Sequence, residues 1–184
     1  METKSNYFLE TEPLGKLLAK FSVPTIISLL VATLYNIVDQ LFIANADYLG
    51  SYGNAANSVV FPLTLIALGL AMLMGDGGCT IASMALGADD KKRADHVVGT
   101  SISVLVIMGI ILMAIYLIIP DPILTLFGGR VNAHTFELAK EYLFWIALGI
   151  PFYMFGQAMN PIIRADGNPR FAMIVSTSGA VINI

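Results

Sequence analysis

A series of long apolar runs, separated by short polar segments, is what most limits the fold of this chain. Five runs follow one another, at about residues 21–46, 55–86, 97–119, 142–161 and 171–184. A helix needs about 20 apolar residues to cross the roughly 30 Å hydrocarbon core of a bilayer. In lipid such a segment must satisfy its own backbone polar groups, which a helix does. We therefore expect an all-α integral membrane protein, a helical bundle with five transmembrane spans.

The composition agrees with a membrane protein. Hydrophobic residues make up 57% of the 184 residues and charged residues only 12%, against about half and a quarter in soluble domains. The net charge of −3 gives no reason to expect nucleic acid as a partner. Residues 1–20 lack the apolar core and cleavage site of a signal peptide. We expect a cytoplasmic N-terminal segment over residues 1–20 and a transmembrane bundle over residues 21–184, with the lipid bilayer as its surroundings.

The fifth run is shorter than the others. Its 14 residues make about 20 Å of helix at 1.5 Å per residue, less than the thickness of the hydrocarbon core. A chain that ends there would leave its carboxyl terminus inside the membrane. The expectation is therefore that this span is incomplete and that the sequence is a fragment or a truncated gene product.

Basic residues predict the orientation, because loops on the cytoplasmic side carry an excess of Lys and Arg. If the spans alternate, eight of the ten fall on the side of the N-terminus, namely Lys4, Lys16, Lys20, Lys91, Lys92, Arg93, Arg164 and Arg170. Only Arg130 and Lys140 fall on the other side. The pattern predicts a multi-pass protein of the cell (plasma or inner) membrane with a cytoplasmic N-terminus.

Asp39 is the first of two carboxylates inside the predicted spans. An ionised acid at the bilayer centre costs about 2.5–3.5 kcal/mol on insertion scales, so it generally faces a cavity or a partner. Tyr35 and Asn36 precede it by four and three residues and share its helix face, while Gln40 lies one turn from Asn36. Desolvation disfavours the charged form of a carboxyl group, which allows reversible protonation, and carboxylate and amide oxygens equally suit a sodium ion.

Asp76 is the second carboxylate, in the flexible sequence Gly75-Asp76-Gly77-Gly78. We interpret it as a structural or gating residue of the second span. The same span carries small residues at every fourth position, which let another helix approach closely: Ala67, Ala71, Gly75, Cys79, Ser83 and Gly87. This ridge predicts helix packing, or a surface on which helices slide.

The sequence carries no motif of an enzyme or of a cofactor site. It has no GxxxxGK[ST] loop, no HExxH and no GxSxG. The single cysteine, Cys79, excludes a thiolate metal cluster, and His96 and His134 lie apart without ligand spacing. We expect no catalysis, no cofactor beyond a coupling ion and no resident metal.

Four stretches together resemble one family, the multidrug and toxic compound extrusion (MATE) transporters. The resemblance is to the N-terminal lobe and runs from about Leu14 to Ile184, nearly the whole chain. The stretches are VPTIISLLVATLYNIVDQLFIA, LGSYGNAANSVVFPL, GGCTIASMALGADDKKRADHVVGT and MNPIIRADGNPRFAMIVSTSGAVINI. Their order and spacing carry the resemblance rather than any one of them. Two positions depart from the family pattern, Ala44 in place of a common Gly and Asp76 in place of a residue that is more often uncharged.

The resemblance implies a twelve-helix transporter of two lobes, of which this chain would hold five helices of the first. It implies an antiporter that exports organic cations and other amphiphiles in exchange for protons or sodium ions. Asp39 matches the coupling carboxylate of many members. Asn183 matches an Asn of the fifth helix that contributes to the cation site, whereas the Asp that follows it by four residues falls outside this sequence. The implied partners are small amphiphilic or cationic substrates and the missing second lobe, and sodium would bind at Asp39 and Asn183.

Two alternatives remain open at this stage. One is a lipid-linked oligosaccharide flippase of the related superfamily, whose cavity is lined by several basic residues. No Lys or Arg lies well inside any of the five spans, which favours the drug-type transporter. The other is a five-span membrane scaffold subunit that transports nothing, for which substitution of Asp39 would be silent.

Overall fold

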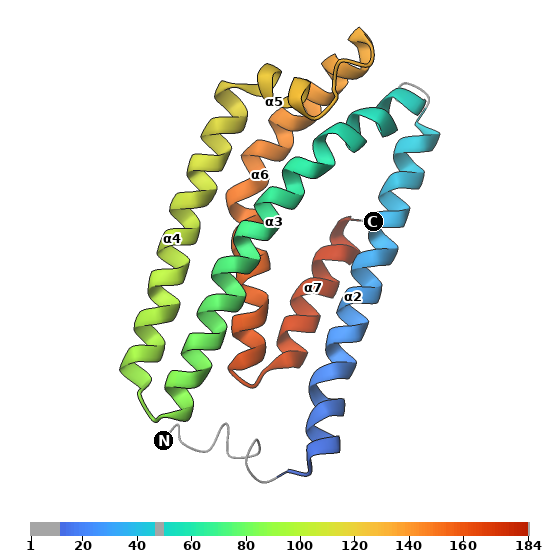
Figure 1. Cartoon of the computed structure of the whole chain (residues 1–184). Coiled ribbons are helices and arrows are strands. Elements are labelled where there is room, and N and C mark those ends of the chain that lie inside the picture. The colour runs from blue at the N-terminus through green and yellow to red at the C-terminus, as the bar shows by residue number, and fades with distance from the viewer. Residues whose placement is uncertain (1–11, 47–49, 184) are drawn as a thin grey trace. The chain divides into compact units, whose positions relative to one another are not determined.

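The computed structural model describes residues 12–46 and 50–183. Their helices are α2 (Leu14–Asn45), α3 (Gly50–Gly87), α4 (Lys91–Ile118), α5 (Pro120–Leu126), α6 (Ala133–Ala165) and α7 (Pro169–Asn183), drawn in Figure 1. The helices are joined by short turns, and no strand occurs among the described residues. The predicted all-α class is confirmed.

Within residues 12–46 and 50–183, four helices are long and apolar enough to cross a membrane: Leu14–Asn45, Ser51–Gly87, Lys91–Ile118 and Ala133–Ala165. They contain the first four apolar runs of the sequence. The fifth run forms a shorter apolar helix, Pro169–Ile182. The multi-span membrane architecture is thus confirmed for four spans, with a fifth apolar helix beside them in the sequence.

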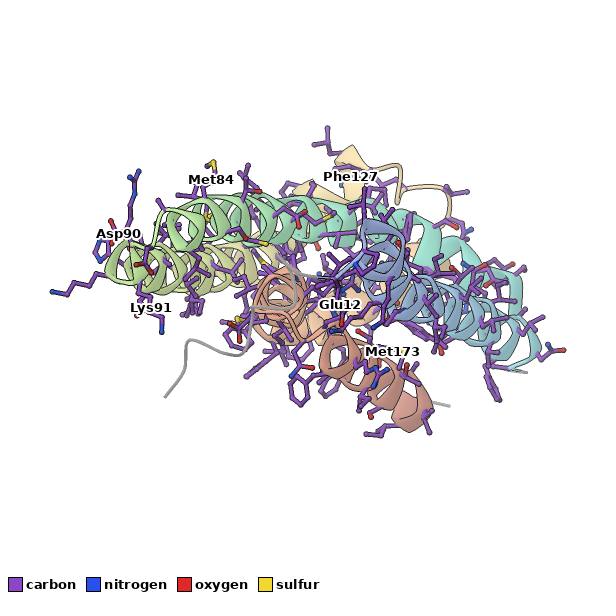
Figure 2. All side chains as sticks on the ribbon, turned by 90° about the horizontal axis from the view of Figure 1, so that it is seen from below. Glu12, Met84, Asp90, Lys91, Phe127 and Met173 are labelled. Atoms are coloured by element: carbon purple, nitrogen blue, oxygen red, sulfur yellow. The ribbon has the colours of Figure 1, made fainter. Side chains whose placement is uncertain are left out.

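The helices extend beyond the apolar runs because polar residues cap and continue them. Asp90 accepts a hydrogen bond from the backbone N–H of Arg93 at 3.0 Å, so α4 begins at Lys91 rather than near residue 97. Asn132 accepts one from the N–H of Thr135 at 2.7 Å, which starts α6 well before residue 142. Such side-chain acceptors satisfy the free N–H groups of a first helical turn. Figure 2 shows Asp90 and Lys91 at the turn between α3 and α4.

The helices group into two compact units. The first unit contains Met1–Asp39 and Asn160–Ile184, and the second contains Gln40–Met159. The boundaries fall inside helices, so α2 and α6 each contribute to both units. The second unit holds α3, α4, α5 and most of α6.

The core of the second unit is built from one stripe on each long helix. In α6 the buried positions recur every three or four residues, which is the spacing of a single helix face: Thr135, Ala139, Leu143, Ala147, Ile150, Met154 and Ala158. All of them except Thr135 form one cluster with buried residues of α3 and α4, including Val60, Leu63, Ala67, Leu105 and Leu112. The helices α3 and α4 run side by side (Figure 1).

Glycines allow α3 to approach its two neighbours closely. A Cβ atom on Gly75 would lie 2.7 Å from Cα of Ala158 in α6, and one on Gly78 would overlap the side chain of Ser101 in α4. In α4, a Cβ on Gly109 would lie 3.1 Å from Cα of Pro151. The predicted small-residue ridge packs only in its first half, because Ala67, Ala71 and Gly75 are buried, Cys79 is half-buried, and Ser83 and Gly87 are exposed.

A hydrogen bond between α4 and α3 adds to this packing. The hydroxyl of Tyr116, a residue that is only 4% exposed, donates to the backbone carbonyl of Leu63 at 3.0 Å. A tyrosine buried among apolar helices needs such an acceptor. The bond ties the last turns of α4 to the middle of α3.

In the first unit, the turn between α6 and α7 follows from Gly167 and Pro169. Gly167 has φ = 84°, the left-handed conformation that favours glycine after a helix C-terminus. Pro169 is the first residue of α7, where its missing N–H costs nothing. The predicted turn over residues 164–170 is found as the three residues between these helices.

Candidate functional site

The polar patch of α2 centres on Asp39, the last residue of α2 that belongs to the first unit. Asp39 is half-buried, and so is Tyr35 one turn before it. The two side chains interact electrostatically, as neighbours four positions apart on a helix do. The structure therefore brings together the acid and the aromatic hydroxyl that the sequence places on one face.

The other two polar residues of the patch lie exposed on the same helix. Asn36 donates from Nδ2 to the backbone carbonyl of Ala32 at 2.7 Å. Its donor group is thereby occupied by the helix, and the oxygen Oδ1 is the atom that remains to bind a cation. Gln40 is exposed and is the first residue of the second unit.

Asn183 is the last residue of α7 and belongs to the first unit, as Asp39 does. Its backbone is helical, and its side chain lies outside the described residues. That Asn183 and Asp39 hold one ion together stays a prediction.

Asp76 belongs to the second unit and is exposed on α3. Its neighbour Gly75 is buried against Ala158. Cys79 lies close enough to interact with its charge and hydrogen-bonds to Ser83. The hydroxyl of Thr80 donates to the backbone carbonyl of Asp76 at 2.8 Å. The gating role of Asp76 stays a prediction.

The first unit contains a polar pair that was not expected from the sequence. Asn160 of α6 donates from Nδ2 to Oγ of Ser176 in α7 at 2.8 Å, and Ser176 donates in turn to the carbonyl of Ala172 at 3.0 Å. The sequence signals Asn160 only as an amide immediately before Pro161, at the end of an apolar run, and it does not indicate the partner. The pair fixes α7 against the end of α6.

The described part of the chain contains no group of three or more His, Cys, Asp or Glu side chains that could hold a metal ion. Its recognisable polar site is therefore the patch around Asp39, a single carboxylate with an aromatic hydroxyl and amide groups, on a helix long enough to cross a membrane. Such a set can bind one proton or one small cation through oxygen atoms.

Comparison with known families decides what kind of protein carries this patch. The family model described as MatE matches residues 24–184, most of the chain. This chain belongs to the MATE family. The resemblance drawn from the sequence is confirmed.

Curated MATE relatives are similar along the whole chain. The multidrug export protein MepA of Staphylococcus aureus (strain MSSA476) is 30% identical over 184 residues, which are 100% of this chain and 40% of that protein. MepA of Staphylococcus saprophyticus is 30% identical over 185 residues, again 100% of this chain and 40% of that protein. The chain thus spans about two fifths of the length of the curated relatives it matches.

Solved transporter structures share the fold of this chain. A crystal structure of a MATE protein in complex with MaD5 matches with a TM-score of 0.85 and 29% identity, over 97% of this chain and 39% of the other. A transporter of the MOP superfamily from Pyrococcus furiosus Vc1 (DSM3638) matches with a TM-score of 0.84 and 29% identity, over 97% and 38%. The chain is a multi-span membrane protein of the MATE family of multidrug efflux transporters.

Proposed function

We propose that residues 1–184 form most of the N-terminal lobe of a cation-coupled antiporter that exports amphiphilic organic compounds, and that Asp39 carries the coupling proton or sodium ion. The observation that supports this most directly is the half-buried carboxylate of Asp39 beside Tyr35, on a helix of membrane-spanning length. Family membership supports the transport of drugs and not a scaffold role.

The proposed coupling depends on the environment of this carboxylate. Away from bulk water, the charged form of Asp39 is stable only with a bound cation or a polar partner. Tyr35 places a hydroxyl-bearing ring one turn away. Binding of a proton or a sodium ion therefore neutralises the carboxylate of Asp39. Loss of that ion leaves a negative charge, which favours either the binding of another cationic ligand or the other conformation of the transporter. Competition of ion and substrate for the lobe would drive export.

Sodium binding would use oxygen atoms of the same patch. Asp39 supplies a carboxylate and Asn36 an amide oxygen, because the Nδ2 group of Asn36 is bonded to Ala32. Asn183 would add a further amide oxygen from α7. Oxygen ligands of this kind suit a hard cation, whereas a proton needs only Asp39 itself.

The transporter would work in the cell membrane, with the N-terminus in the cytoplasm and with a second lobe as its partner. The relatives are about two and a half times as long as this chain. Two lobes are what alternating access requires, because one bundle rocks against the other around a fixed site.

The test is efflux by the full-length reading frame that contains residues 1–184. We expect Asp39→Asn to abolish drug efflux while the protein still inserts into the membrane at normal levels, and Asp39→Glu to retain part of it. Asp121→Asn is the matched control, since Asp121 pairs with Lys140 at 2.8 Å on the exposed surface and its loss should leave efflux unchanged. Full export by Asp39→Asn would remove the coupling role of this residue, whereas a wild-type protein without any efflux would favour a scaffold.

A further inference from the structure

Asp76 is a second charged group that the proposed coupling does not use. It lies 11 residues before Gly87, the end of α3, which is about 17 Å along a helix that rises 1.5 Å per residue. The α3 helix has 38 residues and would be about 57 Å long, so Asp76 falls at membrane depth if α3 crosses the bilayer. An ionisable residue at that depth indicates a functional site.

Two close helix crossings determine the direction in which Asp76 points. Gly75 packs on the backbone of Ala158 in α6, and Gly78 packs on Ser101 in α4. Because both neighbours approach within contact distance of the backbone, α3 cannot rotate about its axis at this level. Asp76 is exposed between these two buried glycines, so its carboxylate points out of the second unit.

The charge of Asp76 is not balanced inside that unit. Among the described residues of the second unit, the basic side chains are Lys91, Lys92 and Arg93 at the start of α4, Arg130 in the turn after α5, and Lys140 in the first turns of α6. The helix segments that α3 touches here, residues 97–105 and 150–159, contain no charged residue. A cation that compensates Asp76 must therefore come from outside the unit.

The rest of this α3 face suggests the chemistry of that cation. Residues about whole helical turns away share the face with Asp76 and are exposed as well: Phe61, Leu65, Met72 and Thr80. An aromatic ring and a flexible thioether suit apolar ligands of varied shape. An apolar strip that ends in a carboxylate complements a molecule with an apolar body and a positive group.

We propose that Asp76 selects positively charged substrates, by holding the cationic group of an amphiphilic compound against this face of α3. The proposal rests on the export function proposed above. It assigns Asp76 a role in specificity that is separate from ion coupling at Asp39 and from gating. Asp76 is thus expected to matter for organic cations and not for uncharged compounds.

Cys79 makes a direct test possible, because this half-buried thiol lies within the electrostatic field of Asp76. The full-length protein in membranes is treated with two methanethiosulfonate reagents, one carrying a trimethylammonium group and one a sulfonate. After correction for their reactivity toward a free thiol, we expect the cationic reagent to label Cys79 roughly tenfold faster, since a nearby opposite charge attracts it. Asp76→Asn should bring the two rates together, and Asp76→Glu should preserve the preference.

Cys79→Ser serves as the background for other thiols, and Asp121→Asn is a matched loss of one acid far from Cys79 in the sequence. Equal rates in the wild type would overturn the proposal, as would a preference that survives in Asp76→Asn. Failure of both reagents to label Cys79 would place this face against lipid and overturn it too.

Transport measurements separate this role from the proposed function. Export of tetraphenylphosphonium by Asp76→Asn should fall roughly tenfold, with export of uncharged triphenylphosphine oxide unchanged, whereas Asp39→Asn should stop both. Loss of both compounds in Asp76→Asn would indicate the gating role instead. A wild-type protein that exports neither compound would overturn the proposed function itself, whatever the labelling shows.

Discussion

Gly75 shows how a single residue can set the distance between two helices. A Cβ atom at this position would lie 2.7 Å from Cα and 2.8 Å from the carbonyl oxygen of Ala158. Both atoms belong to the backbone of α6, so no side-chain rotation can make room. Gly69, six residues earlier in the same helix, has nothing within 4 Å of such an atom.

The two glycines therefore make a matched pair for a stability measurement. We expect Gly75→Ala to destabilise the protein by about 1–3 kcal/mol, because overpacking moves α3 away from α6. Gly69→Ala should instead be neutral or stabilise by about 0.5–1 kcal/mol, because alanine favours a helix. Unfolding in mixed micelles with increasing dodecyl sulfate, followed by circular dichroism, measures both. Equal stability of the two variants would show that the crossing at Ala158 is not tight.

The start of α4 shows how a helix begins inside a charged segment. Asp89 and Asp90 have different roles there, one in the turn and one as the cap of the helix. Asp89 adopts φ = 59°, a left-handed conformation that Asp tolerates better than most residues. Asp90 accepts the N–H of Arg93 and satisfies the first turn. The segment is therefore a three-residue turn followed by helix, although its charge suggests a longer loop.

Removing this cap should loosen the first turn of α4. We expect Asp90→Ala to cost about 0.5–2 kcal/mol, as losses of N-cap acceptors do, and to speed amide exchange over residues 91–95. Asp89→Gly is the control, since glycine adopts positive φ without strain and leaves the cap in place. Hydrogen–deuterium exchange read by mass spectrometry measures both. Unchanged exchange in Asp90→Ala would mean that packing alone holds the turn.

The sequence predicts the long helices well, because a long apolar run in lipid can satisfy its own backbone polar groups only as a helix. It predicts their ends poorly. The third apolar run ends at about residue 119, close to the end of α4 at Ile118, but the proline that follows suits the first position of a helix, and α5 begins at Pro120. The fourth apolar run ends at about residue 161, yet α6 continues to Ala165. Polar caps and prolines depend on local hydrogen bonds, which hydropathy does not report.

The candidate site was predictable only in part, because some of its contacts lie within one helix and others lie between helices. Asp39 and Tyr35 share a helix, so their proximity follows from spacing alone and the structure agrees. Asn160 and Ser176 meet across two helices, and no pattern in either segment predicts that contact. Pairs within one helix can be read from a sequence, whereas pairs between helices require the packing.

The whole molecule also has one orientation across the membrane, which its basic residues predict. Arg130 and Lys140 lie beyond the far end of α4, and three basic residues lie at its start, Lys91 to Arg93. Loops with the excess of Lys and Arg stay in the cytoplasm. Asp121 pairs with Lys140 at 2.8 Å, but acidic neighbours contribute little to this rule. The proposed orientation therefore depends on the basic residues alone.

Thiol labelling of the turns at the two ends of α4 tests this orientation. In a cysteine-free full-length protein, we expect Val131→Cys, in the turn after α5, to react with an impermeant maleimide in intact cells. Ala88→Cys, in the turn before α4, should react only after the cells are permeabilised. Both turn residues are exposed, so a difference reports the side of the membrane and not burial. The reverse pattern would contradict the proposed orientation: it would place the N-terminus outside and Asp39, in the second half of α2, toward the cytoplasmic side of the membrane.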